Sequence, residues 1–237
     1  MSLEWRNLGS KLLNKSTLAI VFCLTGLLLG ACATQDNSAI QLGEEETFDG
    51  LRRVENSRAS AAWVRPDIDL SRYTKVRIEG AGMSFRPVTR TGSSAREFAI
   101  TDTQKRRMRD VLVEVFTEEL KNSTRFQLVE DSGPDVLTVW GGLYDVVSNV
   151  PPERGARDRI FIDQVGAATL VIELRDSQTD QTLARALDRR AASRAGGTMQ
   201  RANSASNWAE VRRVARRWAT MLRERLDAAD NWKIAGS

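Results

Sequence analysis

Two alternating segments joined by a short polar turn constrain the fold more than any other feature of the sequence. Over residues 167–175, every second side chain is apolar: Ala168, Leu170, Ile172 and Leu174. Because successive side chains of a strand point to opposite faces, this alternation predicts a strand that is buried on one face. The polar residues 176–180 then predict a hairpin turn into an antiparallel strand over residues 182–192.

Other segments supply the remaining elements of a single domain. Strands are predicted over residues 75–85, 126–129 and 136–147, with a short edge strand at 160–162, and helices over 103–122 and 208–228. Thr101 and Gln104 have the spacing of a capping box at the start of the first helix. We therefore expect an α+β fold in the order β-α-β-β-β-β-α. Its mostly antiparallel sheet of about five strands would carry both helices on one face, which buries one side of the sheet.

The N-terminal region has the pattern of an export signal. Basic residues precede an apolar run over residues 18–29, which is shorter than the roughly 20 residues that a membrane-spanning helix needs. Small residues then lead into Cys32. This order resembles the lipobox of bacterial lipoproteins, and the resemblance implies that Cys32 is acylated and becomes the first residue of the mature chain.

The resemblance divides the chain into four parts. We expect a lipoprotein signal peptide over residues 1–31, the acylated cysteine and a tether over 32–62, one α+β domain over 63–230 and a tail over 231–237. The tether is polar, although Phe48, Leu51 and Val54 are spaced like a short helical face that would pack on the domain. The expected location is a membrane anchor after export, which in a Gram-negative cell is the outer membrane facing the periplasm.

Missing residue types exclude several kinds of chemistry. The chain has no histidine, and its cysteines are Cys23, in the predicted signal, and Cys32. The mature domain would then lack the groups of Ser-His-Asp and Cys-His enzymes and of zinc sites built from histidine or cysteine. We expect no cofactor and no metal. With 35 basic and 31 acidic residues, the charge balance does not call for a nucleic-acid partner.

Two interpretations remain open for the polar residues of the sheet. The carboxylates nearest to the predicted strands are Asp145, Glu173, Asp176 and Asp188. Glu173 and Asp188 could flank a glycosidic bond across the hairpin, as a glycosidase requires of two carboxyl groups. Alternatively, the carboxylates form cross-strand ion pairs that stabilise an ordinary sheet. Their partners would then be Arg185, Arg189 and Arg190.

The second predicted helix also allows two interpretations. Trp208 and Trp218 are ten residues apart and therefore share a helical face. Such a stripe is typical of a protein core, but it could also line a groove for lipid or peptide between helix and sheet. The arginines of this helix form either a solvated face or a surface for anionic headgroups.

Several stretches of the chain resemble a known family. They are WVRPDIDLSRY at residues 63–73, GPDVL at 133–137, GAATLVIELRDS at 166–177, LARALDRR at 183–190, and residues 203–226. In their order along the chain and in their residues, these stretches resemble an uncharacterised family of bacterial lipoproteins, domain of unknown function 3313. The resemblance implies a lipoprotein and supplies no activity. We therefore expect a non-enzymatic domain that binds an envelope protein or supports an assembly. The alternatives are a carboxylate-dependent enzyme acting on envelope glycans and a lipid-binding module.

Overall fold

The structure is a computed structural model that describes residues 40–88, 97–150, 161–193, 200–201, 204–229 and 232. The predicted signal peptide, Cys32 and residues 233–237 of the predicted tail lie outside these residues. Within the part that is described, no helix combines the length and the apolar character needed to cross a membrane.

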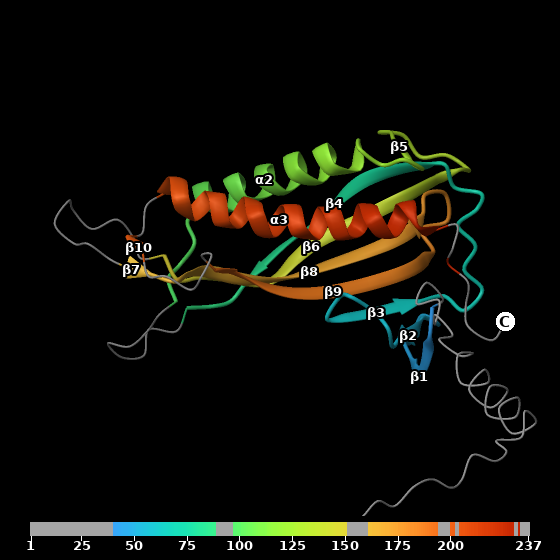
Figure 1. Cartoon of the computed structure of the whole chain (residues 1–237), viewed down its shortest axis with the longest axis horizontal. Helices are drawn as coiled ribbons and strands as arrows, with labels where there is room; N and C mark the ends of the chain where they lie inside the picture. The colour runs from blue at the N-terminus through green and yellow to red at the C-terminus, as the bar shows by residue number, and fades with distance from the viewer. Residues whose placement is uncertain are drawn as a thin grey trace, which may run out of the picture. The chain divides into compact units, whose positions relative to one another are not determined.

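The centre of the fold is an eight-stranded sheet in the order β1-β2-β3-β9-β8-β6-β4-β5 (Figure 1). Its strands are β1 (Leu42–Glu46), β2 (Arg52–Val54), β3 (Ala61–Val64), β4 (Lys75–Phe85), β5 (Gln127–Leu128), β6 (Val136–Ser148), β8 (Gln164–Asp176) and β9 (Thr182–Ser193). The helices are α2 (Asp102–Leu120) and α3 (Ser204–Asp227). A separate pair is formed by β7 (Phe161–Ile162) and β10 (Gln200–Arg201).

The sheet is mixed, and this corrects the predicted architecture of about five mostly antiparallel strands. Strand β4 pairs in parallel with both β6 and β5, whereas the other pairs of the sheet are antiparallel. Helix α2 follows β4 and brings the chain back to the end of the sheet where β4 begins. The strands after the helix can therefore run parallel to β4, which a short hairpin turn would not allow. The predicted α+β class and the hairpin of β8 and β9 are confirmed.

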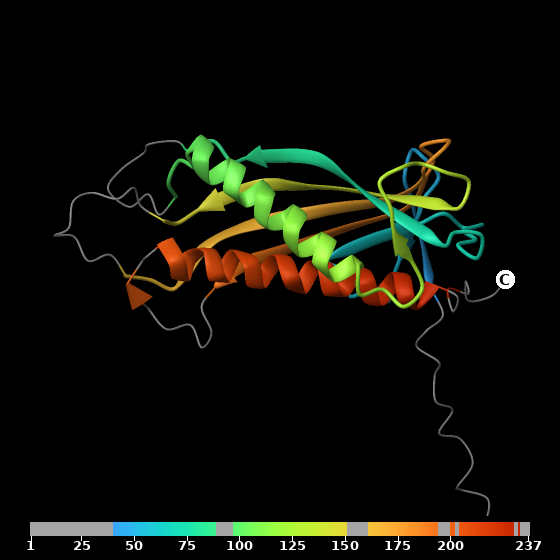
Figure 2. The same ribbon diagram turned by 90° about the horizontal axis from the view of Figure 1, so that it is seen from above.

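Both helices pack on the same face of the sheet, as the sequence predicted. They lie side by side over the strands when the molecule is seen from above (Figure 2), and one apolar core joins them to the sheet. Its most deeply buried members include Val76, Leu120 and Leu137. Helix α2 begins with the predicted capping box, in which Thr101 accepts a hydrogen bond from the backbone N–H of Gln104.

Three short strands extend the sheet beyond β9, where the sequence analysis placed a tether. Residues 42–54 form β1 and β2, and β3 joins them to the edge of β9. Leu51 is completely buried, whereas Phe48 is 99% exposed, so these residues do not form the short helical face that their spacing suggested. Regular structure therefore begins upstream of residue 63, because pairing with β9 orders a segment that has little apolar periodicity of its own.

Glycines mark the predicted irregularity in β4. Pairing with β6 shifts register between Gly80 and Gly82, and Gly82 has a φ of +91°. A Cβ atom on Gly142 of β6 would lie 2.8 Å from the carbonyl oxygen of Gly82. The two strands therefore approach so closely that only glycine fits at this point.

Candidate functional site

The helix-free face of the sheet carries an ordered row of polar and aromatic residues. Cross-strand pairing aligns one residue from each of six strands, from β2 to β4, so that each lies beside the next. The row is Arg53, Trp63, Arg185, Glu173, Trp140 and Glu79. We call these six residues the polar row. Neighbours along strand β8 point to the helices instead, since Ile172 and Leu174 belong to the apolar core.

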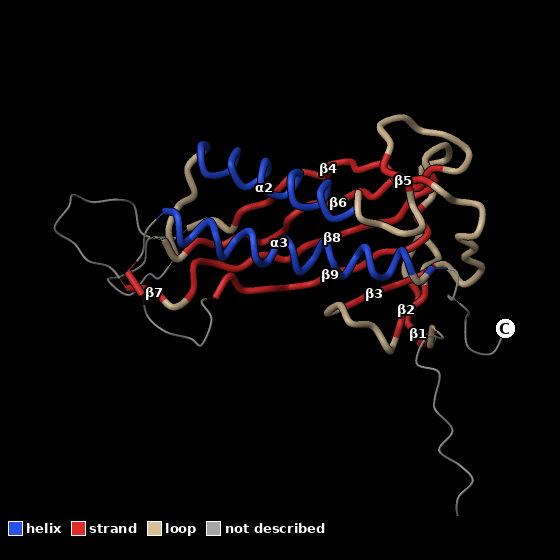
Figure 3. Tube along the Cα trace, turned by 45° about the horizontal axis from the view of Figure 1, so that its top comes forward, coloured by secondary structure: helices blue, strands red, loops and turns tan. Residues whose placement is uncertain are grey.

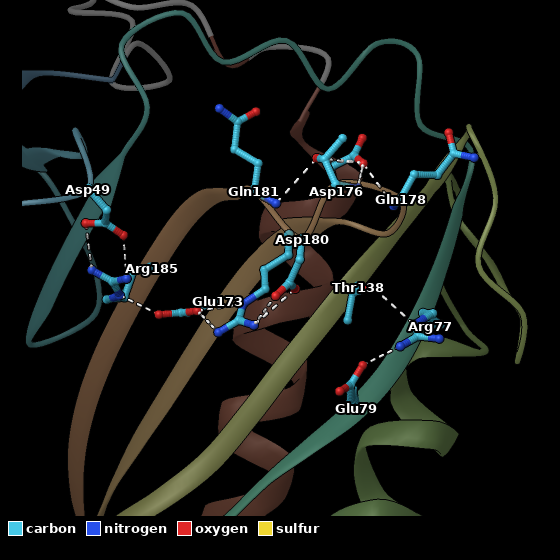
Figure 4. A network of polar contacts seen from close by, with 12 residues as sticks. Asp49, Arg77, Glu79, Thr138, Glu173, Asp176, Gln178, Asp180, Gln181 and Arg185 are labelled. Carbon is cyan, nitrogen blue, oxygen red and sulfur yellow. Dashed lines mark hydrogen bonds and ion pairs between the residues drawn. The ribbon is translucent and has the colours of Figure 1, made fainter.

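Glu173 is the centre of a chain of ion pairs along this face (Figure 4). Its two carboxylate oxygens accept from Arg185 Nε at 2.6 Å and from Arg175 Nε at 2.7 Å. Arg185 Nη2 also donates to Asp49 at 2.7 Å, and Arg175 Nη1 to Asp180 at 3.1 Å. The result is an alternating series of three carboxylates and two guanidinium groups that fixes each member's orientation.

Two members of this series, Asp49 and Arg185, have pKa values that are shifted by their mutual contact. The hydrogen bond from Arg185 holds the pKa of Asp49 below its usual value. Burial disfavours the charge on Arg185, but its bonds to Asp49 and Glu173 outweigh that effect and raise its pKa. Asp49 and Arg185 therefore both favour their charged forms and are held as an ion pair.

Aromatic rings stack on two guanidinium groups of the helix-free face. The guanidinium of Arg175 lies 4.2 Å from the centroid of the Trp140 ring, and that of Arg53 lies 4.9 Å from Trp63. Trp63 also donates from Nε1 to Glu45 at 3.2 Å. The stacked rings and guanidinium groups form a surface in which flat apolar groups alternate with fixed charges.

Asp145 and Arg189 form a second cluster on the same face. Asp145 accepts from Arg86 Nε at 2.7 Å and from Arg189 Nη1 at 2.8 Å, and Arg86 chiefly lowers its pKa. Its φ of 52° is in the left-handed region, at a register shift of β6. The neighbouring Tyr144 is 47% exposed, so the cluster surrounds an accessible aromatic ring.

Asp176 holds the turn after β8 and is not part of the polar row. One oxygen accepts from the backbone N–H groups of Gln178 and Thr179, each at 2.9 Å, and the other from the Tyr73 hydroxyl at 2.7 Å. Burial alone would raise its pKa, but these bonds outweigh it and lower the pKa to about 2. The residue is thus a structural carboxylate that stays ionised in the folded protein.

Asp188 lies on the opposite face of the sheet from Glu173. It is buried beneath α3, where it accepts from Trp218 Nε1 at 2.9 Å and from the backbone N–H of Ser60 at 3.1 Å, and it pairs with Arg190. Glu173 and Asp188 therefore cannot flank one substrate bond, which removes the carboxylate pair considered for a glycosidase. The alternative interpretation is confirmed for Glu173, which pairs with Arg185 across the hairpin.

The structure also shows which residues the sequence analysis missed. Arg175 could have been found, because the alternation of β8 puts it on the same face as Glu173. Asp49 carried no such signal, since it lies in the stretch predicted as a tether. Among the described residues, no group of three acidic, histidine or cysteine side chains is placed to hold a metal ion.

Comparison with known proteins gives one match that covers most of the chain. The family model "Protein of unknown function (DUF3313)" matches residues 43–222. A search of curated proteins gives no match.

Among solved structures, the chain is similar to a PelC dodecamer from Paraburkholderia phytofirmans and to a DUF330 protein from Xanthomonas campestris. The first is 9% identical, with 63% of this chain and 88% of that chain covered and a TM-score of 0.32. The second is 9% identical, with 81% and 95% covered and a TM-score of 0.38.

Proposed function

The chain belongs to the DUF3313 family, and we propose that it is an envelope lipoprotein that binds a protein partner through the helix-free face of its sheet. In this proposal acylated Cys32 anchors the chain, and the folded domain performs no catalysis. The observation that carries the proposal is the polar row, in which Glu173 is buried at the centre and the surrounding charged and aromatic side chains are partly exposed and already held by ion pairs and ring contacts.

The composition of this face suits protein recognition. Tryptophan, tyrosine and arginine dominate the energetics of protein interfaces, and here Trp140 and Tyr144 lie on β6 and Arg189 on β9, with β8 between the two strands. The ring contact of Trp140 with Arg175 and the ion pair of Arg189 with Asp145 restrict these two side chains before any partner arrives, so less conformational entropy is lost on binding. The face is therefore better organised for binding than a row of solvated charges.

The candidate carboxylates support binding over acid–base catalysis. A general acid at neutral pH needs a raised pKa, whereas the hydrogen bonds described above lower the pKa of Asp145 and Asp176. Glu173 and Asp188 are each bonded to arginine and lie on opposite faces. The hydrogen bonds and ion pairs of each of these carboxylates are therefore explained by a structural role.

Affinity capture of crosslinked full-length protein from native membranes tests the partner-binding face. We expect a Trp140→Ala/Tyr144→Ala double variant to lose at least about tenfold of the captured partner, as hot-spot truncations do. Val113→Ala is the matched control, because Val113 is 54% exposed on helix α2 and should leave capture unchanged. Full capture by the double variant, with the partner lost on Val113→Ala, would place the interface on the helices instead.

The anchor is tested separately with Cys32→Ser. We expect this variant to leave the detergent phase in a two-phase extraction, since attached acyl chains contribute about 0.8 kcal/mol per buried methylene to membrane binding. Mass spectrometry of the unaltered protein should show the lipid on Cys32. Detergent partitioning that is identical for the variant and the unaltered protein refutes the anchor while leaving the binding face untouched.

A further inference from the structure

A cavity of about 130 Å³ lies on the helix side of the sheet, at the strands that the two helices do not fully cover. In Figure 3, α3 follows β8 and β9, and β1 to β3 lie beyond the helix layer. The sheet side of the cavity is lined by small residues of β3 and β9, namely Ala62, Ala184 and Ala186. Trp218 and Leu222 of α3 form its opposite wall.

The lining is mostly apolar but includes an arginine without an acidic partner. Arg225 of α3 is half-buried, and none of the described carboxylates forms an ion pair with it. Burial and then the nearby charge of Arg58 lower its pKa. Arg58, whose charge acts on Arg225, is itself paired with Glu224 at 3.6 Å. Arg225 is therefore the cation of this lining that has no carboxylate partner among the described residues.

A second unsatisfied donor lines the same cavity. The indole nitrogen of Trp232 is buried and finds no hydrogen-bond acceptor within the described part of the chain. Buried donors normally have a partner, because a buried N–H without an acceptor has lost its hydrogen bond to water and gained nothing in return. An acceptor supplied by a ligand would satisfy this N–H as well as Arg225.

The other charged groups of the lining are already neutralised. Asp188 is held by Trp218, Ser60 and Arg190, as described above. Arg185 is held by Glu173 and Asp49 on the helix-free face. Among the described residues, the unpaired charge of the cavity is therefore positive and comes from Arg225.

We propose that this cavity binds a single-chain anionic amphiphile such as a fatty acid, with its carboxylate at Arg225 and part of its alkyl chain against Ala186 and Leu222. An apolar protein cavity of about 150 Å³ accepts benzene, so this one accommodates a segment of a single chain and not a diacyl lipid. Acyl chains attached to Cys32 would carry no anionic group, so the charge of the cavity favours a free ligand. The cavity lies on the helix side of the sheet, although Trp63 and Arg185 of the polar row are among its lining residues.

Quenching of tryptophan fluorescence by 10-bromodecanoate tests the site, because Trp218 and Trp232 line the cavity. With the full-length chain held in amphipol, we expect saturable quenching that weakens at least about tenfold in Arg225→Gln, which loses the charge-assisted hydrogen bond. Arg217→Gln is the matched control, since Arg217 is exposed on the same helix and does not line the cavity. Equal weakening in both variants, or in neither, overturns the proposal.

Two further arms separate this site from nonspecific adsorption. Ala186→Phe should fill the cavity and abolish saturable quenching, and thermal unfolding checks that this variant is folded. If it does not fold, the comparison of Arg225→Gln with Arg217→Gln still tests the proposal. Decyltrimethylammonium should fail to displace 10-bromodecanoate, because it has the same chain length and the opposite charge. Displacement as strong as that by decanoate contradicts the role given to Arg225. Neither result depends on the partner-binding face.

Discussion

The two faces of the central sheet are built from the same strands but are held by different forces. In β8, Leu170, Ile172 and Leu174 are buried in the core beneath the helices. On the other face of the strand, Glu173 and Arg175 are held by ion pairs and a stacked ring. The difference indicates that the helix-covered face determines stability, while the helix-free face is free to carry a recognition surface.

The largest expected effect comes from the covered face. Leu137→Ala removes a fully buried side chain of β6 and should lower the free energy of unfolding by about 3 kcal/mol, because it leaves a cavity in the core. Val171→Ala, on the helix-free face of β8, should cost less than half as much. Urea titrations of both variants measure the two losses in free energy of unfolding. Equal losses would show that the helix-free face contributes as much to stability as the covered face.

Acid pH should reveal the structural carboxylate Asp176. Its pKa is about 2 in the folded protein against an ordinary value of 3.8, so it contributes about 2 kcal/mol of stability that is fully present above pH 4. This contribution is lost as the pH falls from about 4 through 2. Unfolding measured across that range should be less pH-dependent in Asp176→Asn. An unchanged pH dependence in the variant contradicts the assignment.

Ion pairs on the helix-free face should contribute least to stability. Arg175→Gln removes one partner of Glu173 but leaves Arg185 bonded to it, so we expect a loss of about 1 kcal/mol that shrinks further at high salt. Chemical denaturation at low and high ionic strength measures both quantities. A loss as large as that of Leu137→Ala would mean that this face is a second structural core.

Long periodic segments made most of the fold predictable from the sequence. Strands β4, β6, β8 and β9 and both helices lie where their apolar patterns placed them, because each buries one face in a single core. The strand order was not predictable, since periodicity reports which face is buried and not which strand is the neighbour. Strands β1 to β3 were missed because they are short and polar and are ordered by pairing with β9.

The site was predictable only where residues share one hairpin. Alternation along β8 and β9 was enough to suggest that Glu173 pairs with Arg185. The ion pair with Asp49 spans 136 positions of sequence, and the stacking of Arg175 on Trp140 joins β8 to β6, which do not form one hairpin predicted from the sequence. Such contacts depend on strand order, which is the part of the fold that the sequence did not provide.

Site-specific photocrosslinking in cells tests the central claim most directly. A photoreactive residue placed at Tyr144 or Thr169 of the helix-free face, and at Val113 or Arg217 of the helices, samples both sides of the domain. The account predicts that one discrete protein adduct forms from Tyr144 and Thr169 and is absent from the two helical positions. The same adduct formed from Val113 and Arg217 alone would contradict it.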